Sequence, residues 1–207
     1  FIFFGNPVSA QTHTPKTVAI SARCGGYYEY LPVNYLTNTS QTYPIIFYIH
    51  GGASYGNGST ASLALMLQNE GIPYYINQNL FPATFPLNSG TTSFIVISPQ
   101  FNSEPSPSEL KQVIDYILAQ NYRIDPLRIY ITGYSVGGGV TWRAPSSLVA
   151  ATRFAAMVPV AGYLNPYVDT TAQYIAAANL PAWAIHSISD GTIPYSTSAN
   201  FVAKINS

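Results

Sequence analysis

Short, densely apolar runs recur along the chain, separated by polar, glycine-rich or proline-containing stretches. The runs are rich in β-branched and aromatic side chains, which is typical of strands buried on both faces of a sheet. We expect Pro32 to end the first of them and Pro99 to end the third. The predicted strands are 27–31, 43–50, 93–98, 128–132, 155–160 and 182–186.

Helical spacing occurs between these runs. Residues 109–120 place apolar side chains three, four, seven and eight positions apart, which predicts a helix with one buried face. Residues 103–108 supply the serines and prolines of a loop that starts a helix. Shorter helices are predicted at 63–67 (ending near Gly71), 136–143 (limited by Pro145), 171–178 and 195–205.

Buried strands that alternate with helices indicate an α/β protein with a mostly parallel central sheet and helices on both faces. No internal repeat is visible, and residues 11–207 have the length of a single domain with a sizeable core. Active sites of such sheets lie at the carboxyl ends of the strands. Chemically capable residues are therefore expected directly after strands.

Composition narrows the classes of partner. Charged residues make up 8% of the chain and the net charge is zero, so we expect neither a nucleic-acid partner nor a charged tail. No apolar run reaches the length of a membrane span. The polar residues are mostly uncharged and include 17 tyrosines. This composition suits a secreted protein that acts on carbohydrate, polymer or another neutral substrate.

The N-terminal residues support secretion. The apolar run 1–4 is followed by Val8-Ser9-Ala10, which resembles a cleavage site, so residues 1–10 are predicted to be the end of a signal peptide. A short buried strand is the alternative. Cys24 is the single cysteine, so no disulfide can form within the chain, and its thiol is either buried or paired outside the chain.

The stretch 131–139, ITGYSVGGG, contains the pattern G-x-S-x-G around Ser135. This pattern places a serine on a sharp, strained turn from strand to helix, where side chains at Gly133 and Gly137 would clash. The turn exposes the hydroxyl above the sheet and directs the N–H groups of the next helix toward it. An ordinary turn is the alternative, but the strand before and the helix after Ser135 favour a nucleophile.

Two further segments follow predicted strands. After 43–50, the sequence His50-Gly51-Gly52-Ala53 allows backbone N–H groups to approach an oxyanion, so Gly52, with Ala53 next, is predicted to form the oxyanion hole with Val136. His50 is predicted to brace this loop rather than act as the base. After 182–186, Asp190 is placed to orient an imidazole, although an Asp-Gly turn explains it equally well. The loop 74–90 is expected to border the site.

In combination these segments resemble the α/β-hydrolase fold from about Tyr27 onward. HGGA, GYSVGG and D-G-x-I-P follow three strands in the order of that family, and YYEYLP and IHSISDGTIP are similar to secreted esterases, including polyhydroxybutyrate depolymerase-like and feruloyl or acetylxylan esterase-like proteins. The resemblance implies a Ser-Asp-His triad in that chain order. It makes Ser135 the nucleophile and Asp190 the acid, and it implies no cofactor or metal.

The histidines depart from the family pattern. They stand at positions 13, 50 and 186, and none follows Asp190, where the family places its base. We therefore expect a fragment that ends before the last strand and its histidine loop. An inactive hydrolase is the next possibility. Least favoured is His186 as a relocated base, because it belongs to the strand end that sets up Asp190 and is expected to be structural.

The resulting prediction is an extracellular serine hydrolase of small-molecule or polymeric carboxylic esters, with no cofactor. One alternative is a serine peptidase of the prolyl-oligopeptidase type, which the low charge of the chain disfavours. The other is a non-catalytic, hydrolase-like module that binds polymer surfaces. A histidine in the continuation past Ser207 would separate the enzyme from the binding module.

Overall fold

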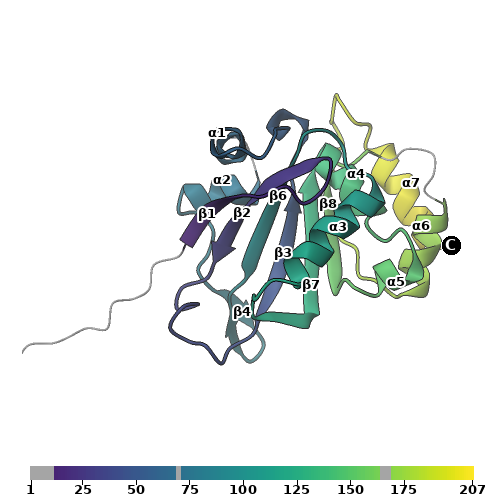
Figure 1. Cartoon of the computed structure of the whole chain (residues 1–207). Helices are drawn as coiled ribbons and strands as arrows, with labels where there is room; N and C mark the ends of the chain where they lie inside the picture. The colour runs from purple at the N-terminus through teal and green to yellow at the C-terminus, as the bar shows by residue number, and fades with distance from the viewer. Residues whose placement is uncertain (1–11, 69–70, 164–168) are drawn as a thin grey trace, which may run out of the picture.

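The computed structural model describes residues 12–68, 71–163 and 169–207 (Figure 1). The predicted signal-peptide residues 1–10 lie outside the described residues. The main feature is a 6-stranded sheet with the strand order β1-β2-β6-β3-β7-β8. These strands are β1 (Thr12–Thr17), β2 (Cys24–Leu31), β3 (Tyr43–Ile49), β6 (Ile95–Phe101), β7 (Ile124–Tyr134) and β8 (Ala156–Val160).

The sheet is mixed, with a parallel centre. β6, β3, β7 and β8 run parallel to one another, whereas β1 and β2 add an antiparallel edge beside β6. The prediction of a mostly parallel central sheet is confirmed. β1 was not predicted, because its sequence THTPKT contains no apolar alternation and its side chains are mostly half-buried.

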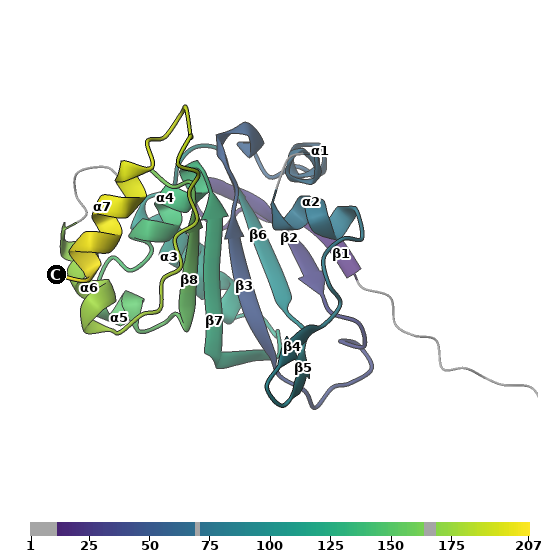
Figure 2. The same ribbon diagram turned by 180° about the vertical axis from the view of Figure 1, so that it is seen from behind.

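Helices cover both faces, as predicted. On one face lie α3 (Pro107–Leu118) and α4 (Val136–Arg143), with α6 (Asp169–Ala177) and α7 (Ser196–Ile205) beside them (Figure 1). The main core forms there, and Trp142 packs edge-on against Phe201 with ring centroids 4.7 Å apart. The opposite face carries α2 (Ile72–Asn77) over Tyr30, Tyr48 and Val96 (Figure 2). The shorter elements are η1 (Gly52–Ser54), α1 (Thr60–Leu63), η2 (Ala64–Leu67), β4 (Phe85–Leu87), β5 (Gly90–Thr92) and α5 (Leu148–Ala151).

The predicted amphipathic helix is α3. It starts at Pro107, before the predicted start at 109, because Ser106 and Glu109 form a capping box and proline is well tolerated in the first turn. Its buried residues are Leu110, Val113, Ile114 and Ile117, as the spacing predicts. This face fixes α3 against the sheet.

Some predicted boundaries were wrong. Gly71 does not follow the end of a helix; it is the N-cap of α2, with Pro73 in the first turn of that helix. Pro99 does not end its strand, because β6 continues to Phe101 along β2. β3 pairs with β6 only as far as Ile97, so the N–H that proline lacks is not needed there.

The predicted strand 182–186 is only partly formed. Two isolated parallel bridges, Met157↔Ala182 and Val160↔Ile185, join this segment to β8. The amides of Trp183 and Ile185 donate to carbonyls of the β8 strand at 3.0 and 3.1 Å. The segment therefore extends the parallel sheet by one incomplete strand, at the edge opposite β1.

Candidate active site

Ser135 lies at the junction of β7 and α4. Its backbone has φ 57° and ψ −117°, a conformation that costs energy for any residue with a β-carbon. The Ser135 amide donates to the carbonyl of Val160 at 2.9 Å, and the Ser135 carbonyl accepts from the amide of Gly139 at 3.0 Å. The turn is therefore held both to β8 and to the helix that it starts.

Glycines around Ser135 are required by close backbone contacts. A β-carbon on Gly133 would lie 2.6 Å from the carbonyl carbon of Gly137 and 2.7 Å from the Ile49 oxygen. A β-carbon on Gly137 would lie 2.6 Å from the carbonyl carbon of Ile49. Real β-carbons do not come this close to backbone. The strand-to-helix turn and the end of β3 thus fit together only without side chains at these two positions.

The loop after β3 lies against this turn. A β-carbon on Gly51 would be 3.6 Å from the Ser135 β-carbon, and one on Gly52 would be 3.6 Å from a Val136 methyl group. Val136 is the first residue of α4 and Gly52 the first residue of η1. The first N–H groups of a helix have no partner within it. The structure therefore brings together the starts of both helices beside Ser135, and Ala53 follows Gly52 within η1.

His50 is held by two backbone groups. Its Nε2 accepts a hydrogen bond from the Phe101 amide at 2.9 Å, so Nδ1 carries the proton and donates to the Gly51 carbonyl at 2.7 Å. Burial lowers the pKa of His50 to about 4. Both nitrogens of this neutral imidazole are thus used to hold the Gly51–Gly52 loop.

Asp190 forms an Asp-Gly turn, which was one of the two explanations that the sequence allowed for this residue. Its Oδ1 accepts from the amides of Ile193 and Thr192 at 2.9 and 2.8 Å. These hydrogen bonds lower the pKa of the Asp190 carboxyl below its usual value. Its Oδ2 makes no hydrogen bond to these amides and lies 3.5 Å from His186 Nε2. One carboxylate oxygen closes the turn and the other remains for an imidazole.

His186 is buried, with its side chain 1% exposed. Nε2 lies 2.9 Å from the Ile193 carbonyl, to which it can only donate, so Nδ1 accepts from the Ser198 hydroxyl at 2.7 Å. This imidazole is fixed between the Asp190 turn and α7. Both of its ring nitrogens are engaged by these groups, so the geometry does not support a relocated base.

Ser135 and Asp190 both follow the carboxyl ends of parallel strands of the sheet. Ser135 is bonded to Val160, Val160 is paired with Ile185, and Asp190 follows five residues later. The third histidine, His13, is in β1, the edge strand farthest from β8, and packs on the Tyr28 ring with centroids 4.6 Å apart. Within the described residues no histidine nitrogen forms a hydrogen bond with Ser135.

Sequence reasoning missed a polar cluster beside the site. Glu104 accepts hydrogen bonds from Arg143 and from the Tyr163 hydroxyl. The sequence analysis predicts Arg143 only as the last residue of a helix. No motif or spacing connects Glu104, Arg143 and Tyr163. They meet because the loop after β6, the end of α4 and the segment after β8 converge.

Other predicted features lie elsewhere. From the loop 74–90, Tyr75 lines a groove with Tyr134, whereas the β4–β5 hairpin lies at the amino end of β6 (Figure 2). Cys24 is buried as a free thiol, and burial raises its pKa to about 11.

The described residues contain no metal-binding group of histidine, cysteine and carboxylate side chains, and no described helix could cross a membrane.

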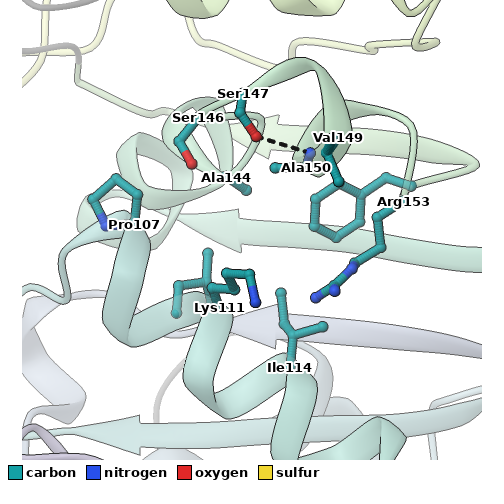
Figure 3. Close-up of a pocket in the computed structure, with 11 residues that line it drawn as sticks. Pro107, Lys111, Ile114, Ala144, Ser146, Ser147, Val149, Ala150 and Arg153 are labelled. Carbon is teal, nitrogen blue, oxygen red and sulfur yellow. Dashed lines mark hydrogen bonds between the residues drawn. The ribbon is translucent and has the colours of Figure 1, made fainter.

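Figure 3 shows a separate cavity of about 80 Å³ between α3 and α5. Leu110, Ile114 and Phe154 contribute to its apolar lining, and Lys111 and Arg153 at its rim both bind Asp115. None of the loops around Ser135 lines it. It is not part of the candidate site.

No protein-family model matches this sequence, and the sequence of no curated protein matches it. Solved structures do match. A thermostable esterase aligns with a TM-score of 0.62 at 22% identity, covering 95% of this chain and 51% of that chain. The feruloyl esterase module from Clostridium thermocellum gives 0.58 at 15% identity, with coverages of 98% and 75%. The chain has the α/β-hydrolase fold. An acylaminoacyl peptidase from Pyrococcus horikoshii gives 0.56 at 14% identity, with coverages of 97% and 36%.

These structures with the α/β-hydrolase fold are similar to this chain in architecture, and they include both esterases and a peptidase. The chain spans about half the length of the thermostable esterase and about a third of the length of the peptidase. Fold alone does not choose between their reactions. The choice depends on the residues around Ser135.

Proposed function

We propose that this chain is the core of a serine hydrolase that cleaves carboxylic esters through an acyl-enzyme on Ser135. The observation that carries the proposal is the Ser135 turn. It combines a positive φ, the start of a helix and the direct packing of the Gly51–Gly52 loop. An ordinary surface turn requires none of these features, whereas a nucleophile with an oxyanion hole requires all of them.

The reaction follows from this geometry. A base removes the proton of the Ser135 hydroxyl, and the oxygen attacks the ester carbonyl. The N–H groups of Val136 and Gly52 stabilise the oxyanion of the tetrahedral intermediate. The base then protonates the departing alcohol, and water releases the acid from Ser135. The Oδ2 of Asp190 would hold the base in the correct tautomer.

We propose that the base is a histidine in the protein's sequence beyond Ser207. Two structural observations support an additional element there. The amides of Ala184 and His186 have no backbone acceptor within the described residues, so the sheet edge at 182–186 can pair with one more strand. Trp183, in the same segment, is 71% exposed.

The substrate is proposed to be a neutral polymer or carbohydrate ester, hydrolysed outside the cell. The low charge of the chain and its tyrosine-rich, neutral polar composition support this proposal. A feruloyl esterase module among the similar structures agrees with it. No metal or organic cofactor takes part in the proposed steps.

Turnover of a 4-nitrophenyl ester and of a 4-nitroanilide tests the reaction class. We expect the full-length protein to hydrolyse 4-nitrophenyl acetate, and Ser135→Ala to abolish this activity. Ser187→Ala, an exposed serine on the Asp190 loop, is the matched control and should retain it. Cleavage of the amide bond of acetyl-alanine 4-nitroanilide, also dependent on Ser135, would instead identify a peptidase.

A non-catalytic binding module is the second candidate. It is favoured by one observation, that all three histidines make contacts away from Ser135 within the described residues. Full-length protein that is folded but hydrolyses neither substrate would support this candidate and contradict the enzyme.

A further inference from the structure

A group of charged side chains is assembled around the loop that follows β6 and has no part in the proposed chemistry. Glu104, in the loop between β6 and α3, accepts from Arg143 and from the Tyr163 hydroxyl. Arg23 donates to the Glu104 carbonyl at 2.7 Å and to the Glu109 carboxylate at 3.0 Å. Arg143 is 17% exposed and Glu104 is 30% exposed, so both are largely withdrawn from solvent.

Both loops that flank Ser135 lead to this group. On one side, the Tyr55 ring would be 3.6 Å from a β-carbon on Gly52. Burial raises the pKa of Tyr55, and the negative charge of Glu104 raises it further. On the other side, the Tyr163 carbonyl would be 2.5 Å from a β-carbon on Gly139, in the first turn after Ser135. Tyr55 and Tyr163 thus connect the candidate oxyanion loop and the nucleophile helix to Glu104.

The charges of the group balance. Arg143 faces Glu104, and Arg23 faces Glu109, so two cations meet two carboxylates. A site with this balance gives no net attraction to an anion. It does offer many fixed donors and acceptors, because each guanidinium has N–H groups beyond those used in its ion pair. Such a surface matches a neutral ligand with many hydroxyl groups.

Three members of the group, Arg23, Glu104 and Arg143, line an open groove of about 410 Å³, whereas Glu109, the partner of Arg23, does not line it. Its remaining lining is made of hydroxyl side chains and prolines rather than large apolar side chains. The lining residues are Arg23, Glu104, Pro105, Ser106, Pro107, Arg143, Ser146, Thr170 and Thr171. A groove without an apolar floor does not favour an acyl chain or an aromatic ring.

We propose that this groove binds the neutral, hydroxyl-rich part of the ester, and that Arg143 is its central hydrogen-bond donor. The inference rests on the proposed esterase function, because the groove then positions the ester carbonyl at Ser135. Tyr163 is a positioning residue, since its hydroxyl holds the carboxylate that orients Arg143. An oligosaccharide is the simplest ligand with this chemistry.

Binding of a free oligosaccharide tests the groove without catalysis. We would titrate the full-length protein with xylotetraose and follow the amide and arginine Nε–H signals by NMR. We expect saturable shifts at Glu104, Arg143 and Thr171, and about ten-fold weaker binding in Arg143→Gln, the loss expected for one charged hydrogen bond. Tyr163→Phe should weaken binding by a smaller factor, and it provides a second variant if Arg143→Gln fails to fold.

Arg128→Gln is the matched control, because Arg128 is also ion-paired, to Asp125, but at the amino end of β7. It should bind xylotetraose like the unmodified protein. The inference is overturned if xylotetraose causes no saturable shifts, if Arg143→Gln and Arg128→Gln bind equally well, or if trigalacturonate binds more tightly than xylotetraose. Loss of ester hydrolysis with intact xylotetraose binding would instead contradict only the proposed function.

Discussion

The Gly137 α-carbon packs so closely on Ile49 that a β-carbon there would lie 2.6 Å from the Ile49 carbonyl carbon. This contact joins the end of β3 to the first turn of α4. It fixes the distance between the two segments that carry the candidate oxyanion donors, Gly52 and Val136. The geometry of the site therefore depends on a backbone contact and not on side-chain packing.

Gly137→Ala should lower stability strongly. The added methyl group can be accommodated only by moving the backbone of β3 or α4, and we expect a loss of about 3 kcal/mol in the free energy of unfolding. Gly191→Ala is the control, because a β-carbon there meets nothing within 4 Å. Urea denaturation of both variants measures the difference. Equal stability of the two variants would show that the contact is not as tight as described.

At position 135 the usual order of stability, in which an alanine variant is more stable than a glycine variant, should be reversed. Its φ of 57° is unfavourable for alanine and acceptable for glycine, so we expect Ser135→Gly to be more stable than Ser135→Ala by about 1 kcal/mol. At Ser108, which is in the first turn of α3, the order should be normal, with glycine less stable by about 1 kcal/mol. Thermal denaturation of the four variants tests the strain, and the normal order at both positions would contradict it.

Acid should destabilise the protein through His50. Burial lowers its pKa from 6.5 to about 4, so the unfolded chain takes up a proton at a higher pH than the folded protein does. The stabilisation is complete above pH 6.5 and is lost as the pH falls toward about 4, a change on the order of 3 kcal/mol.

Urea denaturation between about pH 7 and about pH 4.5 measures this loss. His50→Gln retains one donor and one acceptor and should show a shallower dependence on pH. His13, whose pKa burial also lowers to about 4, should account for much of the remaining slope, and His13→Gln tests that. Identical slopes in the unmodified protein and His50→Gln would contradict the neutral, buried state of His50.

The sequence predicted those parts of the fold that carry their own signal. Strand 43–50 is a continuous apolar run, and helix α3 has both a capping box and a periodic apolar face, so their boundaries were close. β1 was missed because its strand character comes from backbone pairing with β2. The segment 182–186 has the composition of a strand, but pairing at a sheet edge depends on a neighbour that composition does not reveal.

The same distinction applies to the site. The Ser135 turn and the Gly51–Gly52 loop follow strands and need glycine for steric reasons, so local sequence was sufficient to place them. Asp190 was ambiguous between an orienting carboxylate and a turn, and the structure shows the turn with one oxygen remaining. The cluster around Glu104 joins residues from four distant segments, and only the folded chain brings them together.

The two tryptophans test the open sheet edge. Trp142 is fully buried and Trp183 is 71% exposed. In Trp142→Phe, the fluorescence of Trp183 should be quenched strongly by iodide when the chain ends at Ser207. If a further strand and helix cover this edge, quenching should be much weaker in the full-length protein. Equal quenching of the two forms would remove this support for a base located beyond Ser207.

Fluorophosphonate labelling tests the activation of Ser135 most directly. These probes react with a serine hydroxyl only when a base and an oxyanion hole activate it. We would treat the full-length protein with the probe and map the modified peptide by mass spectrometry, with Ser135→Ala as the control. We expect a single modification, at Ser135, that is absent from Ser135→Ala. A folded full-length protein that remains unlabelled, or that is labelled at another serine, would contradict Ser135 as the nucleophile.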